Sequence, residues 1–263
     1  MDSSSTSAFD GKAPGYDAEF TASALGSLLR VRVWDRLSAV FAGRERLLEL
    51  GCGTGEDAVR LARAGHYVFA TDASAEMIRI ARLKAAAAGC AERIEFSVMP
   101  IEALHTLPRG QTFDGVFSNF GAINCVADIP RLAHSLAAHL QPGAPLLFVA
   151  MGRYVPWEWA WYLARGDRHR AFRRLDRAGV LWRGMNIHYP TPTELAEALA
   201  PQFVTRRRAA LGFALPPSYA AGWLDSRPHW LGALAAVERA TRRVTSGLAD
   251  HYMLEAALAA PAA

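Results

Sequence analysis

The stretch that decides the fold is Leu47-Leu48-Glu49-Leu50-Gly51-Cys52-Gly53-Thr54-Gly55. An apolar run that ends in an acid and then in alternating glycines predicts a buried strand, a tight turn and a helix that begins at Glu56. Glycine accepts positive φ at no steric cost and, because it lacks a Cβ, lets a ligand lie against the backbone. The N–H groups of the turn and of the first helical residues would face that ligand as donors. We therefore expect a ligand site at this turn.

A second carboxylate follows at a distance that is typical of nucleoside binding. Asp72 ends another apolar run, Tyr67-Val68-Phe69-Ala70-Thr71. It lies about 20 residues beyond the first glycine, the offset of a carboxylate that binds both ribose hydroxyls from the tip of the second strand. The two features together predict a nucleoside ligand.

The glycine spacing indicates which nucleoside. Nicotinamide and flavin sites favour G-x-G-x-x-G with no acid before the first glycine, whereas here the third glycine comes one position early and Glu49 precedes Gly51. Glu49-Leu-Gly-Cys-Gly-Thr-Gly, Thr71-Asp72-Ala73-Ser74 and Phe113-Asp114-Gly115-Val116-Phe117-Ser118-Asn119 together resemble the class I S-adenosylmethionine-dependent methyltransferases. The resemblance runs over about residues 47–151 and implies S-adenosylmethionine as the cofactor.

The same resemblance implies a set of cofactor contacts along the carboxyl ends of the strands. They are Glu49, Gly51, Cys52, Gly53, Gly55, Asp57, Asp72, Ala73, Met77, Ile101, Glu102, Asn119 and Phe120.

Three of these residues also have a simpler explanation. Asp57 lies in the first helical turn, where a carboxylate is favoured by the helix dipole alone. Met77 at an apolar helical position can be core filler rather than an adenine contact. Asn119 can be a strand-end hydrogen bonder without a role in the chemistry.

The adenine end departs from the family pattern. Many members have an Asp just past the third strand, where it accepts from the adenine amino group, but the sequence has Pro100 there. Proline offers neither a carboxylate nor an N–H. The backbone N–H of Ile101 and the carboxylate of Glu102 are then the remaining adenine contacts.

The order of predicted elements gives the fold class. Strands at 67–71, 93–98, 113–119 and 145–151 alternate with helices at 56–64, at 75–88 and after Asp128, which demands a parallel sheet with right-handed crossovers. A capping box at Thr191-Pro192-Thr193-Glu194 begins a further helix. Strands at 203–211 and 251–258 complete an antiparallel edge. We expect an α/β fold with a Rossmann-like, doubly wound, seven-stranded sheet, mostly parallel with an antiparallel last strand, and helical insertions that form a lid.

The chain is predicted to have four parts. Residues 1–45 form an N-terminal helical lid segment, and residues 46–151 form the cofactor-binding core. Residues 152–190 are an insertion on the acceptor side. Residues 191–263 return to the core and include a helical excursion at 217–247.

The insertion is the most particular part of the sequence. Its stretch Tyr154-Val155-Pro156-Trp157-Glu158-Trp159-Ala160-Trp161-Tyr162 predicts a short aromatic helix, and residues 165–177 carry a dense run of Arg. One interpretation is an aromatic-walled pocket for an apolar or planar acceptor. The other is that a small lobe needs large side chains for its own core. The Arg run is interpreted as a solvated face rather than a site for RNA, because aromatics do not alternate with it.

A general base is needed only if the acceptor loses a proton. The candidates are His188, Tyr16 and Glu158. Histidine suits the role through its ordinary pKa of about 6.5, although a single His before a proline can be purely structural. Tyr16 lies where many family members place a tyrosine near the methionine end of the cofactor, and its alternative is simple packing.

Composition excludes several classes of protein. At 263 residues, 51% hydrophobic and 21% charged, the chain fits one α/β domain with an added lobe. Its three cysteines predict neither disulfides nor a metal site. No apolar run approaches the roughly 18 residues of a membrane span. The stretch Met1 to Asp10 does not resemble a signal peptide, and its first residues are expected to be disordered. We expect a cytoplasmic monomer or homodimer that binds a small-molecule acceptor and no nucleic acid.

The sequence thus favours methyl transfer from S-adenosylmethionine to a small apolar or aromatic metabolite. Two alternatives stay open. One is an RNA or protein methyltransferase that uses the Arg-rich insertion, and the other is a cyclase or scaffold that binds the cofactor without methyl transfer.

Overall fold

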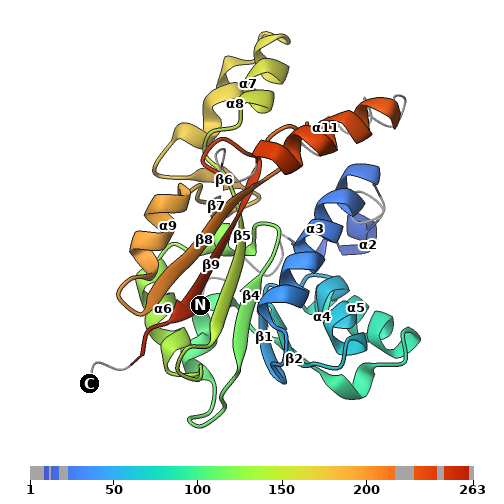
Figure 1. The fold of residues 1–263 in the computed structure, drawn as a ribbon, viewed down its shortest axis with the longest axis vertical. Helices are drawn as coiled ribbons and strands as arrows, with labels where there is room; N and C mark the ends of the chain where they lie inside the picture. The colour runs from blue at the N-terminus through green and yellow to red at the C-terminus, as the bar shows by residue number, and fades with distance from the viewer. Residues whose placement is uncertain (1–8, 12, 18–22, 217–227, 242–245, 261–263) are drawn as a thin grey trace.

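A seven-stranded sheet forms the centre of the computed structural model, which describes residues 9–11, 13–17, 23–216, 228–241 and 246–260. Its order is β3-β2-β1-β4-β5-β9-β8 (Figure 1). The strands are β1 Arg46–Leu50, β2 Tyr67–Asp72, β3 Ile94–Val98, β4 Gly115–Ser118, β5 Pro145–Met151, β8 Phe203–Leu211 and β9 His251–Leu258. β1 to β5 run parallel, and β9 lies antiparallel between β5 and β8. The predicted fold class is confirmed.

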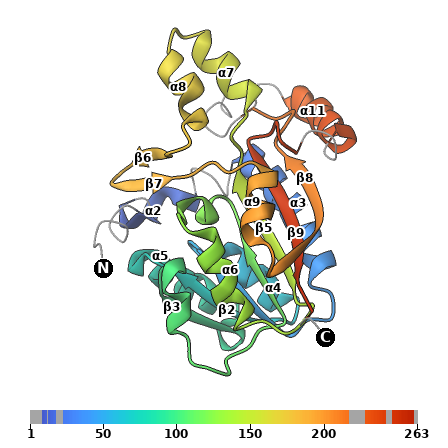
Figure 2. The ribbon, with the colours of Figure 1, turned by 90° about the vertical axis from the view of Figure 1, so that its left-hand side faces the viewer.

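Helices cover both faces of this sheet (Figure 2). Helices α3, α4 and α5 pack on one face, and α6 and α9 pack on the other. The helices are α2 Ala13–Tyr16, α3 Ala24–Val40, α4 Glu56–Arg63, α5 Ala75–Ala87, α6 Ile129–Ala137, α7 Pro156–Leu163, α8 Arg168–Phe172, α9 Pro192–Leu199 and α11 Pro228–Thr241. Ser74, Asp128 and Thr191 cap α5, α6 and α9, and the capping box predicted at Thr191 is complete.

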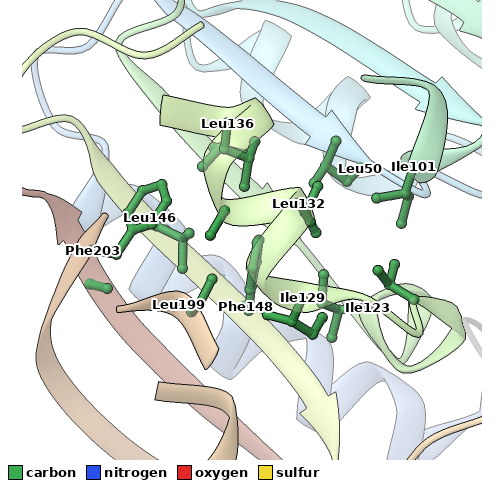
Figure 3. Close-up of a cluster of buried hydrophobic side chains, with 14 of the residues drawn as sticks. Leu50, Ile101, Ile123, Ile129, Leu132, Leu136, Leu146, Phe148, Leu199 and Phe203 are labelled. Atoms are coloured by element: carbon green, nitrogen blue, oxygen red, sulfur yellow. The ribbon is translucent and has the colours of Figure 1, made fainter. Parts of the chain in front are cut away.

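Two hydrophobic clusters hold the layers together. In the first, Leu132 and Leu136 of α6 and Leu199 of α9 pack on Leu50 and Phe148 of the sheet (Figure 3). The second includes the inward stripe of α3, Leu25, Leu29, Val33 and Leu37, against the opposite face. Helix α3 is therefore a structural layer of the fold. Among the described residues before β1, Phe9 lines the ligand cavity described below, and Arg30 of α3 lies over the ring of Phe120 in the cavity wall.

Two strands begin later than the sequence predicts. Residues 91–93 form a short 3-10 turn, so β3 starts at Ile94 instead of Arg93. Phe113 makes an isolated bridge to Leu140, and β4 starts at Gly115. The late start of β4 has a local cause, because the side chain of Asp114 accepts from the backbone N–H groups of residues 45 and 46.

A short hairpin was not predicted. β6 Val180–Trp182 pairs antiparallel with β7 Met185–Ile187. Its turn residues Arg183 and Gly184 both have positive φ, at 50° and 83°. Such a turn matches the twist of a two-residue hairpin, and it brings residues 180–187 back toward the sheet.

Helices α7 and α8 stand away from the sheet, at the top of Figure 1. The ring of Trp159 lies between the rings of Tyr154 and Phe172, at centroid distances of 6.5 and 6.2 Å. The aromatic side chains of α7 are only half-buried, and Glu158 is the buried residue of this helix. Trp159 packs within the lobe, but these rings do not make a buried core.

Parts of two predicted segments lie outside the described residues. They are residues 1–8 of the N-terminal stretch and residues 217–227 and 242–245 of the helical excursion. Within the described residues, α11 confirms a helix in that excursion. None of the helices that the structure describes is both long and apolar enough to cross a bilayer.

Candidate active site

A cavity of about 780 Å³ opens at the carboxyl ends of the parallel strands. This edge is where open α/β sheets bind their ligands. One part of the lining comes from the ends of β1 to β4, with Gly51, Gly53, Asp72, Ala73, Met77, Pro100, Ile101, Glu102, Asn119 and Phe120. The rest comes from the insertion and the β5 and β9 ends, including Met151, Arg173, Arg174, Val180, Trp182, Met185, Ile187, Tyr189, Asp250 and His251.

The three glycines of the turn have different structural roles. Gly51, Gly53 and Gly55 all have positive φ. A Cβ on Gly51 would meet the Cβ of Ala122 at 2.3 Å, and one on Gly55 would meet that of Ala81 at 2.8 Å, so both positions serve close packing. A Cβ on Gly53 would meet nothing within 4 Å. Gly53 is therefore the position where the backbone itself faces the cavity, whereas Gly55 does not line it.

Asp72 lies on the cavity wall where the sequence places it. Its Oδ2 accepts from the N–H of Gly53 at 2.8 Å, and its Oδ1 accepts from the N–H of Ser74 at 2.9 Å. Burial raises the pKa of Asp72, although these two backbone hydrogen bonds oppose the rise. Each carboxylate oxygen keeps a second lone pair, so the group can accept from two ligand hydroxyls.

Two buried acceptor atoms near the glycine turn have no hydrogen-bond partner among the described residues. They are Oε2 of Glu49 and Oδ1 of Asn119. Burial raises the pKa of Glu49 well above its ordinary value, and the nearby Asp57 adds to the rise. Buried polar atoms are rarely left unpaired. Of the two residues, Asn119 lines the cavity, so its Oδ1 can accept from a ligand there, whereas Glu49 lies behind the cavity wall.

Asp57 and Cys52 do not line the cavity. Asp57 is buried and accepts at Oδ1 from Nη1 of Arg30 at 2.8 Å and from Nε1 of Trp34 at 2.7 Å. Its Oδ2 accepts from Nδ2 of Asn119 at 2.9 Å. Asp57 is thus more than a partner of the helix dipole, because it fixes which way Asn119 points. The N–H of Cys52 is occupied by the carbonyl of Thr71.

Phe120 stands at the junction between the two parts of the cavity. Its φ of 51° lies in the left-handed region, which is unfavourable for a bulky residue. Arg30 lies over its ring at 4.9 Å, and the ring centroid of His251 lies 5.9 Å from that of Phe120 in an edge-to-face arrangement. Strain of this kind persists where the surroundings over-determine it and clusters at functional sites.

The adenine end keeps its predicted residues. Pro100, Ile101 and Glu102 line the cavity together with Met77. Ile101 begins a 3-10 turn, Ile101–Thr106, at whose start backbone N–H groups lack intrahelical partners. Met77 is also buried in the molecule, so the two readings of this residue do not exclude each other.

The N-terminal segment closes the cavity from outside. The ring of Phe9 lies 5.3 Å from that of Trp182, and both line the cavity. Asp10 accepts a short hydrogen bond from Oγ of Ser74. Asp17 accepts from Oγ1 of Thr54 and pairs with Lys84, both at 2.7 Å. Tyr16 ends α2 beside these contacts, and its catalytic role stays a prediction.

Comparison with known proteins agrees with this geometry. A family model described as a methyltransferase domain matches residues 47–143. The ubiquinone biosynthesis O-methyltransferase of Chelativorans sp. (strain BNC1) is 38% identical over 105 residues, which are 40% of this chain and 39% of that protein. Residues 47–143 are thus similar to a methyltransferase domain. The chain spans only about two fifths of the length of that relative.

Solved structures share the fold of this methyltransferase domain and its additions. The CcbJ methyltransferase from Streptomyces caelestis has a TM-score of 0.61 at 15% identity and covers 98% of both chains. Geranyl diphosphate C-methyltransferase from Streptomyces coelicolor A3(2), crystallised with S-adenosyl-L-homocysteine, has 0.58 at 14%, over 87% of this chain and 76% of that one. The [4+2]-cyclase SpnF has 0.57 at 19%, over 87% and 81%. The fold alone therefore does not decide the reaction.

Two of the predicted bases lie outside the cavity of the methyltransferase domain. His188 does not line it, although its neighbours Ile187 and Tyr189 do. The backbone of His188 is held by Asn124 through two hydrogen bonds of 2.8 and 2.6 Å. Glu158 is buried and forms ion pairs of 3.0 and 2.6 Å with Arg173 and Arg174. Neither side chain faces the space that a methyl acceptor would occupy.

The acceptor side of the methyltransferase domain is built from other residues than expected. The side chains of 154–162 do not line the cavity, whereas those of Arg173, Arg174, Val180, Trp182, Met185, Ile187 and Tyr189 do. Arg174 is buried, so the Arg run is not a uniform solvated face.

Asp250 and His251 also line the cavity, although neither was predicted as a site residue and His251 was expected only as the first residue of the last strand. The sequence contained a signal for their position. The first residue of an antiparallel strand lies at the same edge of the sheet as the last residues of its parallel neighbours, and here His251 pairs with Met151.

Proposed function

We propose that the chain transfers a methyl group from S-adenosylmethionine to a small apolar or aromatic metabolite. The observation that carries the proposal is one continuous cavity with two unlike parts. One part has the glycine turn and Asp72, and the other has Trp182, Met185 and Ile187. Its volume of about 780 Å³ lies high in the range of about 300–1,000 Å³ for ligand sites, which leaves room for an acceptor beside a nucleoside.

The residues present fit the cofactor. Gly53 leaves open space where a side chain would stand, and Asp72 has lone pairs for two ribose hydroxyls. The unpaired Oδ1 of Asn119 on the cavity wall is an acceptor for the ammonium group at the amino-acid end, and the carboxyl group of Glu49 lies behind that wall. Bound here, S-adenosylmethionine would supply an activated methyl group on a sulfonium. The protein then has to align the acceptor with it and keep water out.

The acceptor part of the cavity is apolar and balanced in charge. Its walls include Met151, Val180 and Trp182. The two guanidiniums there, Arg173 and Arg174, pair with the carboxylates of Glu158 and Asp250. These paired charges make no demand for an anionic acceptor, which favours a neutral apolar or aromatic one.

Calorimetry on the intact chain tests the cofactor part. We expect S-adenosylmethionine and S-adenosylhomocysteine to bind to the parent protein, and Asp72→Ala to bind them at least tenfold more weakly. Asp35→Ala, on the exposed side of α3, is the matched control and should bind like the parent. If the parent binds neither ligand, or if Asp72→Ala binds them as tightly as the parent, the proposal is wrong.

The alternatives predict different results. An RNA methyltransferase would use the Arg run, but Arg174 is buried and bound to two acids. A cyclase or scaffold would bind the cofactor and never produce S-adenosylhomocysteine with any acceptor. Methyl transfer to a member of a panel of phenols, alcohols and amines separates these cases.

A further inference from the structure

The acceptor side of the cavity contains a buried His and Asp pair that the proposed function does not yet use. His251 is the first residue of β9 and pairs with Met151, the last residue of β5. It lines the cavity and is only 8% exposed. Its place on a strand of the central sheet makes it more rigid than a loop residue.

Asp250 orients the imidazole. Oδ2 of Asp250 lies 3.1 Å from Nδ1 of His251, and Oδ1 lies 2.8 Å from Nη2 of Arg174. This 3.1 Å contact is an ion-pair distance without hydrogen-bond alignment, and Nδ1 has no other partner among the described residues. A carboxylate this close to Nδ1 favours the proton on that nitrogen and leaves Nε2 as an acceptor. Because His251 lines the cavity, Nε2 is the ring nitrogen that a ligand there would meet.

Arg174 fixes the position of Asp250. Its Nη1 donates to the backbone carbonyls of Gly152 and Asp250, at 3.2 and 3.4 Å, and its Nη2 also pairs with Glu158. Burial works to raise the pKa of Asp250, but the charges of His251 and Arg174 outweigh it and hold this pKa well below its usual range. Asp250 therefore stays ionised and does not take up the proton itself.

The surroundings of His251 are aromatic on one side and charged on the other. Phe120, which begins the loop after β4, presents its ring at 5.9 Å, and Arg30 lies beyond that ring. The charged groups on the other side are Asp250, Arg174 and, through Arg174, Glu158. Tyr189 lies under Arg174 at 5.1 Å, and burial raises its pKa. Tyr189 therefore stays neutral near pH 7.

We propose that His251 is the catalytic base of this site, that Asp250 is its positioning residue, and that the acceptor is a phenol or alcohol methylated on oxygen. This inference rests on the proposed function. The acceptor oxygen forms a bond to the methyl carbon while the bond from that carbon to sulfur breaks and sulfur keeps the electron pair. The hydroxyl proton moves to Nε2 of His251 and is later released to water. Acceptors without a removable proton need no such base.

A spectroscopic probe tests the base without turnover. 4-Nitrophenol absorbs visible light as the phenolate and not as the neutral phenol. Added to the protein saturated with S-adenosylhomocysteine, it should ionise about one pH unit or more below its value in water, because the imidazolium stabilises the phenolate. His251→Gln should abolish the shift, Asp250→Asn should reduce it, and His134→Gln, on the exposed face of α6, should leave it unchanged.

Turnover gives a second reading. With a hydroxyl acceptor from the panel, His251→Gln should lower kcat about 10²- to 10⁴-fold and leave the KM for S-adenosylmethionine unchanged. The fall in kcat of His251→Gln should be smaller for more acidic phenols.

The outcomes separate the two proposals. If S-adenosylhomocysteine does not bind, the proposed function fails. If it binds but the probe ionises as in water, or the shift survives His251→Gln, the inference fails and the proposed function stands. A loss of activity in His188→Gln with full activity in His251→Gln would also overturn it.

Discussion

Asn119 donates a hydrogen bond from its Nδ2 to Oδ2 of Asp57 over 2.9 Å, and this bond ties the loop after β4 to α4. The other oxygen of Asp57 accepts from Arg30 and Trp34 of α3. The orientation of Asn119 therefore depends on a helix that lies before the first strand. With Nδ2 held by the carboxylate, Oδ1 is left as the acceptor for a ligand.

Replacement of Asp57 should cost stability. Asp57→Ala removes the carboxylate from a buried pair with Arg30, whose side chains are each 5% exposed, and breaking such a pair costs about 3–5 kcal/mol. We expect the free energy of unfolding in urea to fall by about that amount. Glu76→Ala removes the exposed pair with Arg79 on α5 and should cause no measurable change. Similar losses in the two variants would contradict the central role of Asp57.

Gly53 should control ligand binding more than folding. Its φ is 52°, and a Cβ there would project into open space. Gly53→Ala should lose about 1 kcal/mol of stability from the positive φ and bind S-adenosylhomocysteine at least tenfold more weakly. Gly143→Ala, with φ of 72° and no atom within 4 Å, carries the same backbone cost far from the cavity and should bind normally. Calorimetry with both variants checks the difference.

The sheet was predictable because its strands are long apolar runs with clear ends. β5, β8 and β9 have the predicted bounds. The helices α5, α6 and α9 follow from Ser74, Asp128 and Thr191, whose side chains form local caps. Local signals of this kind do not depend on the rest of the fold.

The acceptor side could not be predicted from local patterns. β6 and β7 have three residues each, too few for a periodic signal, and the turn has Arg183 where Asn or Asp would mark it. The aromatic density of α7 pointed to the cavity, but which rings line it depends on how the lobe folds over the sheet edge. The cofactor side was more accessible because one turn and one strand end determine it, yet Glu49, Cys52, Gly55 and Asp57 lie behind the cavity wall.

The two tryptophans Trp182 and Trp161 should behave differently. Trp182 contacts Phe9 and lines the cavity, whereas Trp161 stacks with Arg165 at 3.5 Å outside it. Trp182→Ala removes a ring contact of about 0.5–1.5 kcal/mol beyond area burial and opens the cavity. We expect faster dissociation of S-adenosylhomocysteine in Trp182→Ala and an unchanged rate in Trp161→Ala, measured by stopped-flow fluorescence. An effect confined to Trp161→Ala would instead support the interpretation that the aromatic side chains of α7 form the ligand pocket.

Glu49 should lower the stability of the protein at neutral pH. Its pKa in the folded state is raised, chiefly by burial and then by Asp57, so the folded protein holds a proton that the unfolded chain releases above about pH 4.3. Where the folded state binds more protons, stability falls as the pH rises. The free energy of unfolding should therefore decrease from about pH 4.3 upward until Glu49 ionises in the folded protein. Asp250, with a lowered pKa, acts in the opposite sense and only below about pH 3.9.

Glu49→Gln should separate stability from binding. The amide cannot ionise, so the variant should lose much of the decline above pH 4.3 and be more stable than the parent at pH 7. The remaining slope belongs to Asp72, whose pKa is also raised by burial. The same change removes a carboxylate from the ammonium end of the site, so S-adenosylmethionine should bind more weakly. Urea unfolding across pH 4 to 8 and calorimetry check the two effects, and a variant that is less stable at pH 7 but binds normally would show that Glu49 serves the fold instead of the ligand.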